Sequence, residues 1–217
     1  MEEEYLDFVV PTTFVPHLPQ LDELVETATQ NSDGTISEFV KAASQLIHEK
    51  FKYVKGATVV NSSIQDSLAV GAGVCQDFAH LLLGVVRKRG LPARYVSGYL
   101  VPESAASPDA KLQEVIGGYA SHAWAEVYIP NSGRMGLDPT LGKPLGLQHV
   151  RIAYGRDYGD VAPVRGVYKV QAGQRLSVDV RVRPGLDDDG REQLSENKIT
   201  QPERPEIVER AQQPAQQ

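Results

Sequence analysis

The sequence predicts an α+β domain, in which helices come first and antiparallel strands follow. Three observations favour this class. Apolar residues in the first 90 positions recur at helical spacing, and short segments between residues 93 and 138 have alternating or continuous apolar character. Residues 166–182 then resemble a hairpin, with apolar side chains at every second position after an Ala-Gly turn. Helices and antiparallel strands that are separated along a chain are typical of α+β domains.

The N-terminal third predicts one short strand and two helices. Residues 5–11 are expected to form the strand, which Pro11 would close. Residues 17–28 and 33–51 are expected to form helices, the second with Thr35 or Ser37 as N-cap. The second helix should bury one face, because its apolar residues follow the helical period: Ile36, Phe39, Val40, Ala43, Leu46 and Ile47.

A third helix is expected over residues 75–89, and Gly90 and Pro92 would end it. Strands are expected at residues 93–101, 121–129 and 134–138. A long polar stretch, residues 101–118, separates the first two strands. The helices of residues 17–28 and 33–51 could instead contact a partner, but core packing explains their apolar positions more simply.

The length of 217 residues fits one domain with a tail, which we place at residues 1–183 and 184–217. The tail has eight acidic and four basic residues, much Gln and Pro, and no aromatic residue. This composition predicts disorder. The tail supplies −4 of the net charge of −6, so the rest is nearly neutral and has no basic stripe for nucleic acid.

Several classes of protein and site are disfavoured. No apolar run reaches the roughly 18 residues of a membrane span, and the acidic start lacks the basic region of a secretory signal. A single cysteine permits no internal disulfide and no Cys-rich zinc site. We therefore expect a cytoplasmic protein without metal, cofactor, membrane or nucleic-acid partner, and the oligomeric state stays open.

Cys75 stands between the glycines of "GAGVC" and the expected third helix. A helix N-terminus presents unpaired N–H groups and a partial positive charge, which favour a thiolate, the reactive form of cysteine. The glycines would let the chain turn and let a substrate approach. A lone cysteine beside an apolar helix is, however, most often a small buried apolar residue.

Two further residues favour a nucleophile. His122 stands at the start of the strand "SHAWAEVYI", and Asp138 ends the strand "RMGLD" before Pro139. Adjacent antiparallel strands would bring them side by side, with the imidazole facing the helix of Cys75. His122 would then serve as general base and acid, and Asp138 would fix its tautomer.

Together these motifs resemble the transglutaminase-like superfamily, in particular its bacterial branch of proposed cysteine proteases. The similar segments are "GAGVCQDFAHLLLGVVRKRGLPARYVSGYL", "SHAWAEVYIPNSGRMGLDPT" and "GRDYGDVAPVRGVY", within residues 51–168. The resemblance implies a transglutaminase/papain-like core, in which the Cys-bearing helix packs on an antiparallel β-sheet. It also implies Cys75 as nucleophile, His122 as base and Asp138 as its partner.

The resemblance also suggests roles for neighbouring residues. Gln76 and Trp124 are expected to border the substrate cleft, and Asp77 to have a structural role at the helix start. A loop near the cleft, or a loop that packs the last hairpin on the sheet, could be formed by Tyr154, Arg156, Asp157 and Tyr158. Members of this branch often have a β-rich region before the helices; here we expect that region either to be absent or to be represented only by its last strand, residues 4–11.

The implied reaction is acyl transfer on a protein or peptide amide through a thioester, with hydrolysis (protease or deamidase) favoured over crosslinking. A catalytically silent peptide-binding module is the main alternative, and an arylamine N-acetyltransferase, with the same three residue types, is a weaker one. Alkylation kinetics of Cys75 would separate an enzyme from a binding module.

Overall fold

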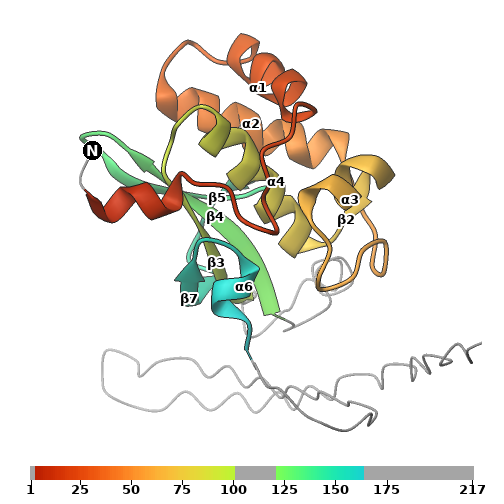
Figure 1. Ribbon diagram of the computed structural model, residues 1–217. Helices are drawn as coiled ribbons and strands as arrows, with labels where there is room; N and C mark the ends of the chain where they lie inside the picture. Colours follow the sequence, from red (N-terminus) through yellow and green to blue (C-terminus); the bar gives the residue numbers. More distant parts are fainter. Residues whose placement is uncertain (1–2, 101–120, 164–217) are drawn as a thin grey trace, which may run out of the picture. The chain divides into compact units, whose positions relative to one another are not determined.

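The computed structural model describes residues 3–100 and 121–163, which form helices packed on one face of a five-stranded sheet (Figure 1). The helices are a 3₁₀-helix η1 (Glu3–Phe8) and the α-helices α1 (Leu21–Gln30), α2 (Ile36–Lys50), α3 (Ile64–Val70), α4 (Cys75–Lys88) and α6 (Tyr158–Val161). The predicted α+β class is confirmed.

Three of the predicted helices are present with nearly the expected bounds, as α1, α2 and α4. Thr35 is the N-cap of α2, and its hydroxyl accepts a hydrogen bond from the Glu38 N–H at 3.3 Å. The amphipathic pattern places Phe39, Val40 and Ala43 in the core. Local capping and helical periodicity were therefore sufficient to locate these elements.

The N-terminal strand predicted for residues 5–11 is wrong, because residues 3–8 form η1 instead. The backbone there pairs with no strand; Tyr5 stacks on Tyr128 with ring centroids 4.3 Å apart. The sequence analysis also missed α3, which begins with a capping box between Ser63 and Asp66. Gly71 ends α3 in the left-handed conformation, with φ of 68°.

The main sheet has the order β6-β5-β4-β3-β7, and all neighbours are antiparallel. Its strands are β3 (Ala93–Leu100), β4 (Ser121–Ile129), β5 (Gly133–Asp138), β6 (Lys143–Pro144) and β7 (His149–Gly155). A separate parallel pair joins β1 (Lys52–Tyr53) to β2 (Ala72–Gly73), just before α4. The predicted strands correspond to β3, β4 and β5, whereas β1, β2, β6 and β7 were not predicted.

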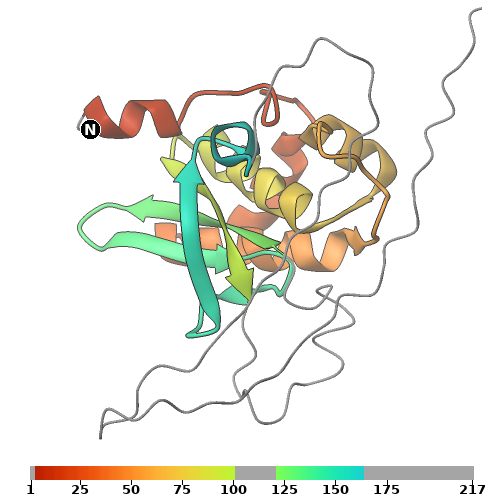
Figure 2. The same ribbon diagram turned by 90° about the horizontal axis from the view of Figure 1, so that it is seen from below.

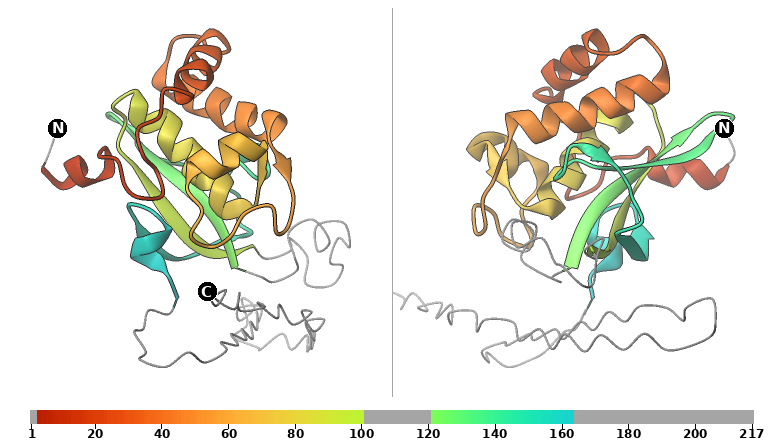
Figure 3. Two further views of the ribbon diagram at one scale, coloured as in Figure 1. Left: turned by 45° about the vertical axis from the view of Figure 1, so that its right-hand side comes forward. Right: turned by 180° about the vertical axis from the view of Figure 1, so that it is seen from behind.

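Helix α4 lies centrally against the sheet and is the most buried helix, with α1 and α2 packed on it (Figures 2 and 3). Alternate β4 side chains, Ala123, Ala125, Val127 and Ile129, enter the same core. Because side chains alternate along a strand, His122 and Trp124 lie on the other face of β4. His122 stands at the end of β4, however, where it interacts with the Cys75 side chain at the start of α4, in agreement with the expected approach of the imidazole to this helix.

The ends of four strands meet at one end of the sheet. Strands β3 and β5 finish there at Leu100 and Asp138, and β4 and β7 begin there at Ser121 and His149, because neighbouring strands are antiparallel. Residues that are far apart in sequence are thereby brought together where α4 begins.

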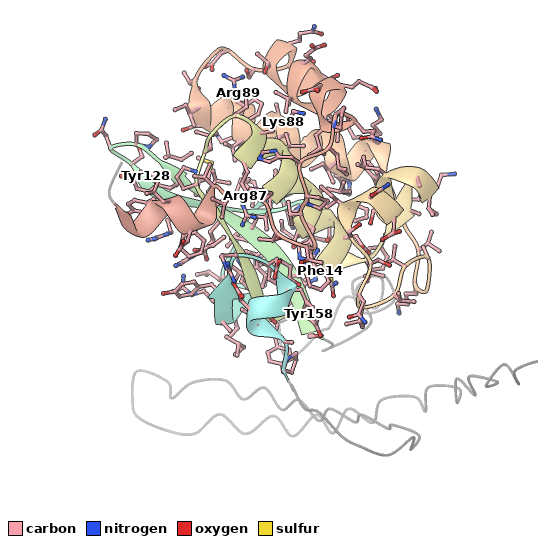
Figure 4. The ribbon with its side chains drawn as sticks, in the orientation of Figure 1. Phe14, Arg87, Lys88, Arg89, Tyr128 and Tyr158 are labelled. Carbon is pink, nitrogen blue, oxygen red and sulfur yellow. The ribbon has the colours of Figure 1, made fainter. Side chains whose placement is uncertain are left out.

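Residues 156–161 pack the end of β7 onto α4. Tyr158 lies beside Phe14 with ring centroids 6.0 Å apart (Figure 4), and its N–H donates to His80 Nε2 on α4 at 3.1 Å. The buried Arg87 donates to the carbonyls of Ala93 and Arg156. These contacts pack the segment on α4, whereas its predicted packing against the hairpin of residues 166–182 lies outside the described residues and its place near the cleft stays a prediction.

Several predictions lie outside the described residues: the polar stretch after β3, the hairpin of residues 166–182, the domain boundary at residue 183 and the disordered tail. Within the described ranges, no helix has both the length and the apolar character required to cross a membrane.

Candidate active site

Cys75 is the first residue of α4 and is partly exposed. The first backbone hydrogen bond of the helix joins the Phe78 N–H to the Val74 carbonyl at 3.1 Å. The N–H groups of Cys75, Gln76 and Asp77 therefore precede the helical ladder, and the positive end of the helix dipole lies at the sulfur. The expected position of Cys75 at a helix N-terminus agrees with the start of α4.

The buried Asp77 side chain fixes the start of α4 through hydrogen bonds. Its carboxylate is 2% exposed and accepts hydrogen bonds from the Val74 N–H (2.8 Å), Thr58 Oγ1 (2.6 Å) and Ser67 Oγ (3.0 Å). A Cβ atom added to Gly73 would lie 2.6 Å from Asp77 Cβ, so glycine is required there by this close approach. The expected structural role of Asp77 agrees with these contacts.

Replacing Asp77 with alanine should lower the free energy of unfolding by roughly 2–4 kcal/mol, because three donors would lose their acceptor in a buried place. Asp66→Ala is the matched control, since Asp66 also accepts an N-cap N–H but lies at the surface, and it should cost about 1 kcal/mol. Urea denaturation measures both. An Asp77→Ala protein as stable as the control, yet unreactive at Cys75, would instead place Asp77 in the chemistry.

His122 and Asp138 form a buried pair. His122 Nε2 lies 2.7 Å from Asp138 Oδ2, and the two side chains are 1% and 0% exposed. The other carboxylate oxygen, Oδ1, accepts from the N–H groups of Thr140 (2.9 Å) and Leu141 (3.2 Å). The tight turn after β5 therefore fixes the carboxylate, and the ring of His122 is oriented by it.

The pair favours a charged imidazolium and a charged carboxylate. Burial alone would lower the pKa of His122, but the hydrogen bond to Asp138 and the interaction with the Cys75 sulfur outweigh it and raise this pKa to about 10. Burial alone would raise the pKa of Asp138, but the hydrogen bonds from His122 and His149 lower it to about 2. In the described residues, His122 Nδ1 has no hydrogen-bond partner. This nitrogen is thus free to exchange a proton.

The sequence analysis missed His149, the first residue of β7. Its Nε2 lies 3.1 Å from the same oxygen, Asp138 Oδ2, that His122 contacts. No motif revealed it, because β7 pairs with β3, whereas Asp138 is on β5. A histidine that opens a strand is the single sequence signal that could have suggested it.

Trp124 and Gln76, predicted to border the cleft, have different environments. Trp124 is 1% exposed, and its ring packs edge-on against His149 at 5.3 Å. Gln76 is partly exposed next to Cys75, and its amide donates to the Val60 carbonyl at 2.9 Å. Burial favours a packing role for Trp124, while contact of either residue with substrate stays a prediction.

Tyr53 of β1 is a further neighbour that the sequence analysis missed. Burial and the nearby negative charges of Cys75, Asp138 and Asp77 raise its pKa to about 12. Its hydroxyl therefore stays protonated at neutral pH, and it borders the site as a neutral donor.

A metal ion is the other chemistry that these side chains could support. The ligand atoms of His122, Asp138 and His149 lie within 4.8 Å of one another. Hydrogen bonds of 2.7 and 3.1 Å from the two rings to one carboxylate oxygen account for that spacing. The same spacing therefore fits a hydrogen-bonded network, and the absence of a metal stays a prediction.

A family model described as the transglutaminase-like superfamily matches residues 22–139, which include Cys75, His122 and Asp138. The chain belongs to the transglutaminase-like superfamily. The resemblance seen in the sequence motifs is thereby confirmed, together with the fold class that it implied.

Relatives of this transglutaminase-like protein are bacterial. An uncharacterised protein of Mycobacterium leprae is 35% identical over 180 residues, which are 83% of this chain and 61% of that protein. The crystal structure of a proposed cysteine protease from Cytophaga hutchinsonii has a TM-score of 0.56 and 30% identity, covering 75% of this chain and 50% of that one.

A protein-glutamine gamma-glutamyltransferase of Pseudomonas aeruginosa is 32% identical over 98 residues, which are 43% of this chain and 14% of that protein. The chain thus spans less than two thirds of each of these three relatives. Membership of the superfamily supports a possible cysteine enzyme, and the reaction itself is addressed below.

Proposed function

We propose that this protein is a thiol-dependent enzyme that transfers acyl groups from protein or peptide amides, with hydrolysis as the main outcome. The observation that carries the proposal is the buried His122–Asp138 pair, whose imidazole also interacts with the Cys75 side chain at the start of α4. A buried charged pair beside a partly exposed thiol has no evident structural purpose, whereas it suits a catalytic triad.

In the acylation step, the Cys75 thiolate attacks the amide carbonyl carbon and a C–S bond forms. The carbonyl oxygen becomes an oxyanion, and the unpaired N–H groups at the start of α4 are suited to stabilise it. The His122 imidazolium then gives its Nδ1 proton to the amide nitrogen. The C–N bond breaks, an amine or ammonia leaves, and a thioester remains on Cys75.

In the deacylation step, neutral His122 takes a proton from water at Nδ1, and the hydroxide formed attacks the thioester. The C–S bond breaks, the carboxylic acid leaves, and the thiolate–imidazolium pair is restored. Asp138 keeps the ring oriented in both steps and stays ionised. If an amine replaces water, the same steps produce a crosslink.

Hydrolysis is favoured by the comparison that covers more of the chain. The Cytophaga relative, described as a proposed cysteine protease, aligns with 75% of the chain, whereas the Pseudomonas gamma-glutamyltransferase aligns with 43%. Both chemistries start from the same thioester, so this preference concerns the acceptor and leaves the roles of Cys75, His122 and Asp138 unchanged.

A silent peptide-binding module is the second candidate. The partly exposed Cys75 would then be a surface thiol without special reactivity. Its alkylation by iodoacetamide at pH 7 should in that case match free cysteine, whereas our proposal predicts a rate at least about tenfold higher, because only about 3% of an ordinary thiol is ionised at that pH.

The reaction is tested by mass spectrometry on a library of glutamine-containing peptides, with and without a primary amine. Cleaved peptides would indicate a protease, a gain of about one mass unit a deamidase, and an amine adduct a crosslinking enzyme, because each follows from one fate of the thioester. We expect cleavage or deamidation to dominate. No product from any peptide, together with ordinary thiol reactivity, would refute the proposal and leave the binding module.

A further inference from the structure

We propose that His149 is a positioning residue that acts through Asp138, sharing the carboxylate with His122 so that His122 can release its proton during turnover. The inference rests on the proposed function, because it assigns a role within the same site. His149 itself is not placed to touch the reacting atoms: it contacts Asp138, and Asp138 contacts His122.

The two imidazoles compete for one oxygen. His122 Nε2 and His149 Nε2 lie 2.7 and 3.1 Å from Asp138 Oδ2, while Oδ1 is occupied by two backbone N–H groups. A carboxylate oxygen that accepts two strong donors is a weaker acceptor for each of them. The second ring therefore limits how tightly Asp138 holds the His122 proton.

The orientation of the His149 ring follows from its neighbours. Its Nε2 faces an ionised carboxylate, which can only accept, so Nε2 carries a proton. Its Nδ1 lies 3.1 Å from the Gly146 backbone N–H and 3.3 Å from the Gly146 carbonyl oxygen, so the same turn can pair with this nitrogen as acceptor or as donor. His149 thus donates to Asp138 through Nε2, and the contacts of Nδ1 with Gly146, in the turn between β6 and β7, orient the ring.

Packing holds the ring in place. The side chain of His149 is 1% exposed, and Trp124 meets it edge-on at an interplanar angle of 83°. Trp124 can take this position because residue 98 is glycine: a Cβ there would lie 2.4 Å from the indole and 2.2 Å from the Val150 carbonyl. The burial of Trp124 is therefore explained as support for His149.

The role is needed because His122 must act both as base and as acid. A ring that holds its proton too tightly is a poor acid toward the leaving amine, so acylation would slow. The other titratable groups at the site are Cys75 and Asp77 on α4 and Tyr53 on β1; of these, Cys75 also raises the pKa of His122. His48 of α2 lies against the Thr140 carbonyl, 2.9 Å from its Nδ1.

The test compares His149→Leu, which removes the donor, with His149→Gln, whose amide can restore it.

The chain has five histidines, so ¹⁵N NMR of the imidazoles can be assigned by single substitutions. In the wild type, we expect His149 Nε2 to carry a proton that is hydrogen-bonded to Asp138. In His149→Leu, the titration midpoint of His122 should rise, and kcat/KM on a cleaved library peptide should fall roughly tenfold, as is typical when a supporting partner is lost. His149→Gln should restore most of the wild-type titration midpoint of His122 and most of the wild-type kcat/KM.

His80→Leu is the matched control, because the His80 side chain is also buried, and its hydrogen bond within the part of the chain that the structure describes is to the Tyr158 N–H. It should destabilise the fold and leave the His122 midpoint unchanged. A His122 midpoint that His149→Leu leaves unmoved, a failure of glutamine to rescue, or zinc bound through His149 in the purified protein would each overturn the inference. The NMR readout needs no substrate, so it separates failure of this inference from failure of the proposed function.

Discussion

Replacing Cys75 with alanine should abolish product formation, lowering the turnover of library peptides by at least about 10³-fold. The sulfur is the nucleophile in the proposed reaction, and no second cysteine exists to replace it. The fold should remain, because Cys75 is only partly buried and alanine is a good helix former. Initial rates by mass spectrometry, together with thermal unfolding by circular dichroism, measure both effects.

The control is the double variant of Cys75→Ala and His122→Ala. Residues that act as one catalytic unit are not additive, so the double variant should be no slower than Cys75→Ala alone. An alanine variant that still forms the wild-type product would remove the mechanism, while equal loss of folding and activity would point to a structural thiol.

Replacing Asp138 with asparagine should lower activity by on the order of 10³–10⁴-fold and move the alkaline limit of activity to lower pH. In the wild type, His122 must be protonated to release the leaving amine, so activity should fall as pH rises through about 10. Without the carboxylate, the main interaction that raises the pKa of His122 is gone. A pH profile of kcat/KM measures the limit.

Alkylation of Cys75 by iodoacetamide provides the control for this profile, because it needs the thiolate and no general acid. The wild-type alkylation rate should stay high above pH 10, where the peptide rate falls. If the alkylation rate and the peptide turnover rate fall at the same pH, unfolding of the protein causes the alkaline limit. If the limit of the asparagine variant equals that of the wild type, Asp138 does not set the charge of His122.

The same pair makes stability depend on pH. The folded pKa of His122 is raised from 6.5 to about 10, so its contribution is complete below pH 6.5 and is lost as pH rises through 10. The folded pKa of Asp138 is lowered from 3.8 to about 2, so its contribution is complete above pH 3.8 and is lost as pH falls through 2. The wild type should therefore exceed Asp138→Asn in stability most clearly between pH 3.8 and 6.5.

Much of the fold could be read from local signals. Capping at Thr35, the apolar stripe of α2 and the glycine after α4 each depend on residues within a few positions, so the sequence defines them directly. The short elements β1, β2, β6 and β7 could not be predicted in this way. They have two to seven residues and are stabilised by partners that are distant in sequence.

The residues Cys75, His122 and Asp138 were likewise visible in sequence motifs, because each stands at the end of a predictable element. Their catalytic roles stay a proposal, but the pairing of His122 with Asp138 follows from two adjacent antiparallel strands. The contact of His149 with Asp138 was visible only in the tertiary structure. Strand β7 pairs with β3 and not with β5, yet its first residue, His149, lies against Asp138 at the end of β5. Side-chain periodicity along the sequence specifies which residues are buried. The order of the strands specifies which of these buried residues are hydrogen-bonded to one another, and long-range packing decides that order.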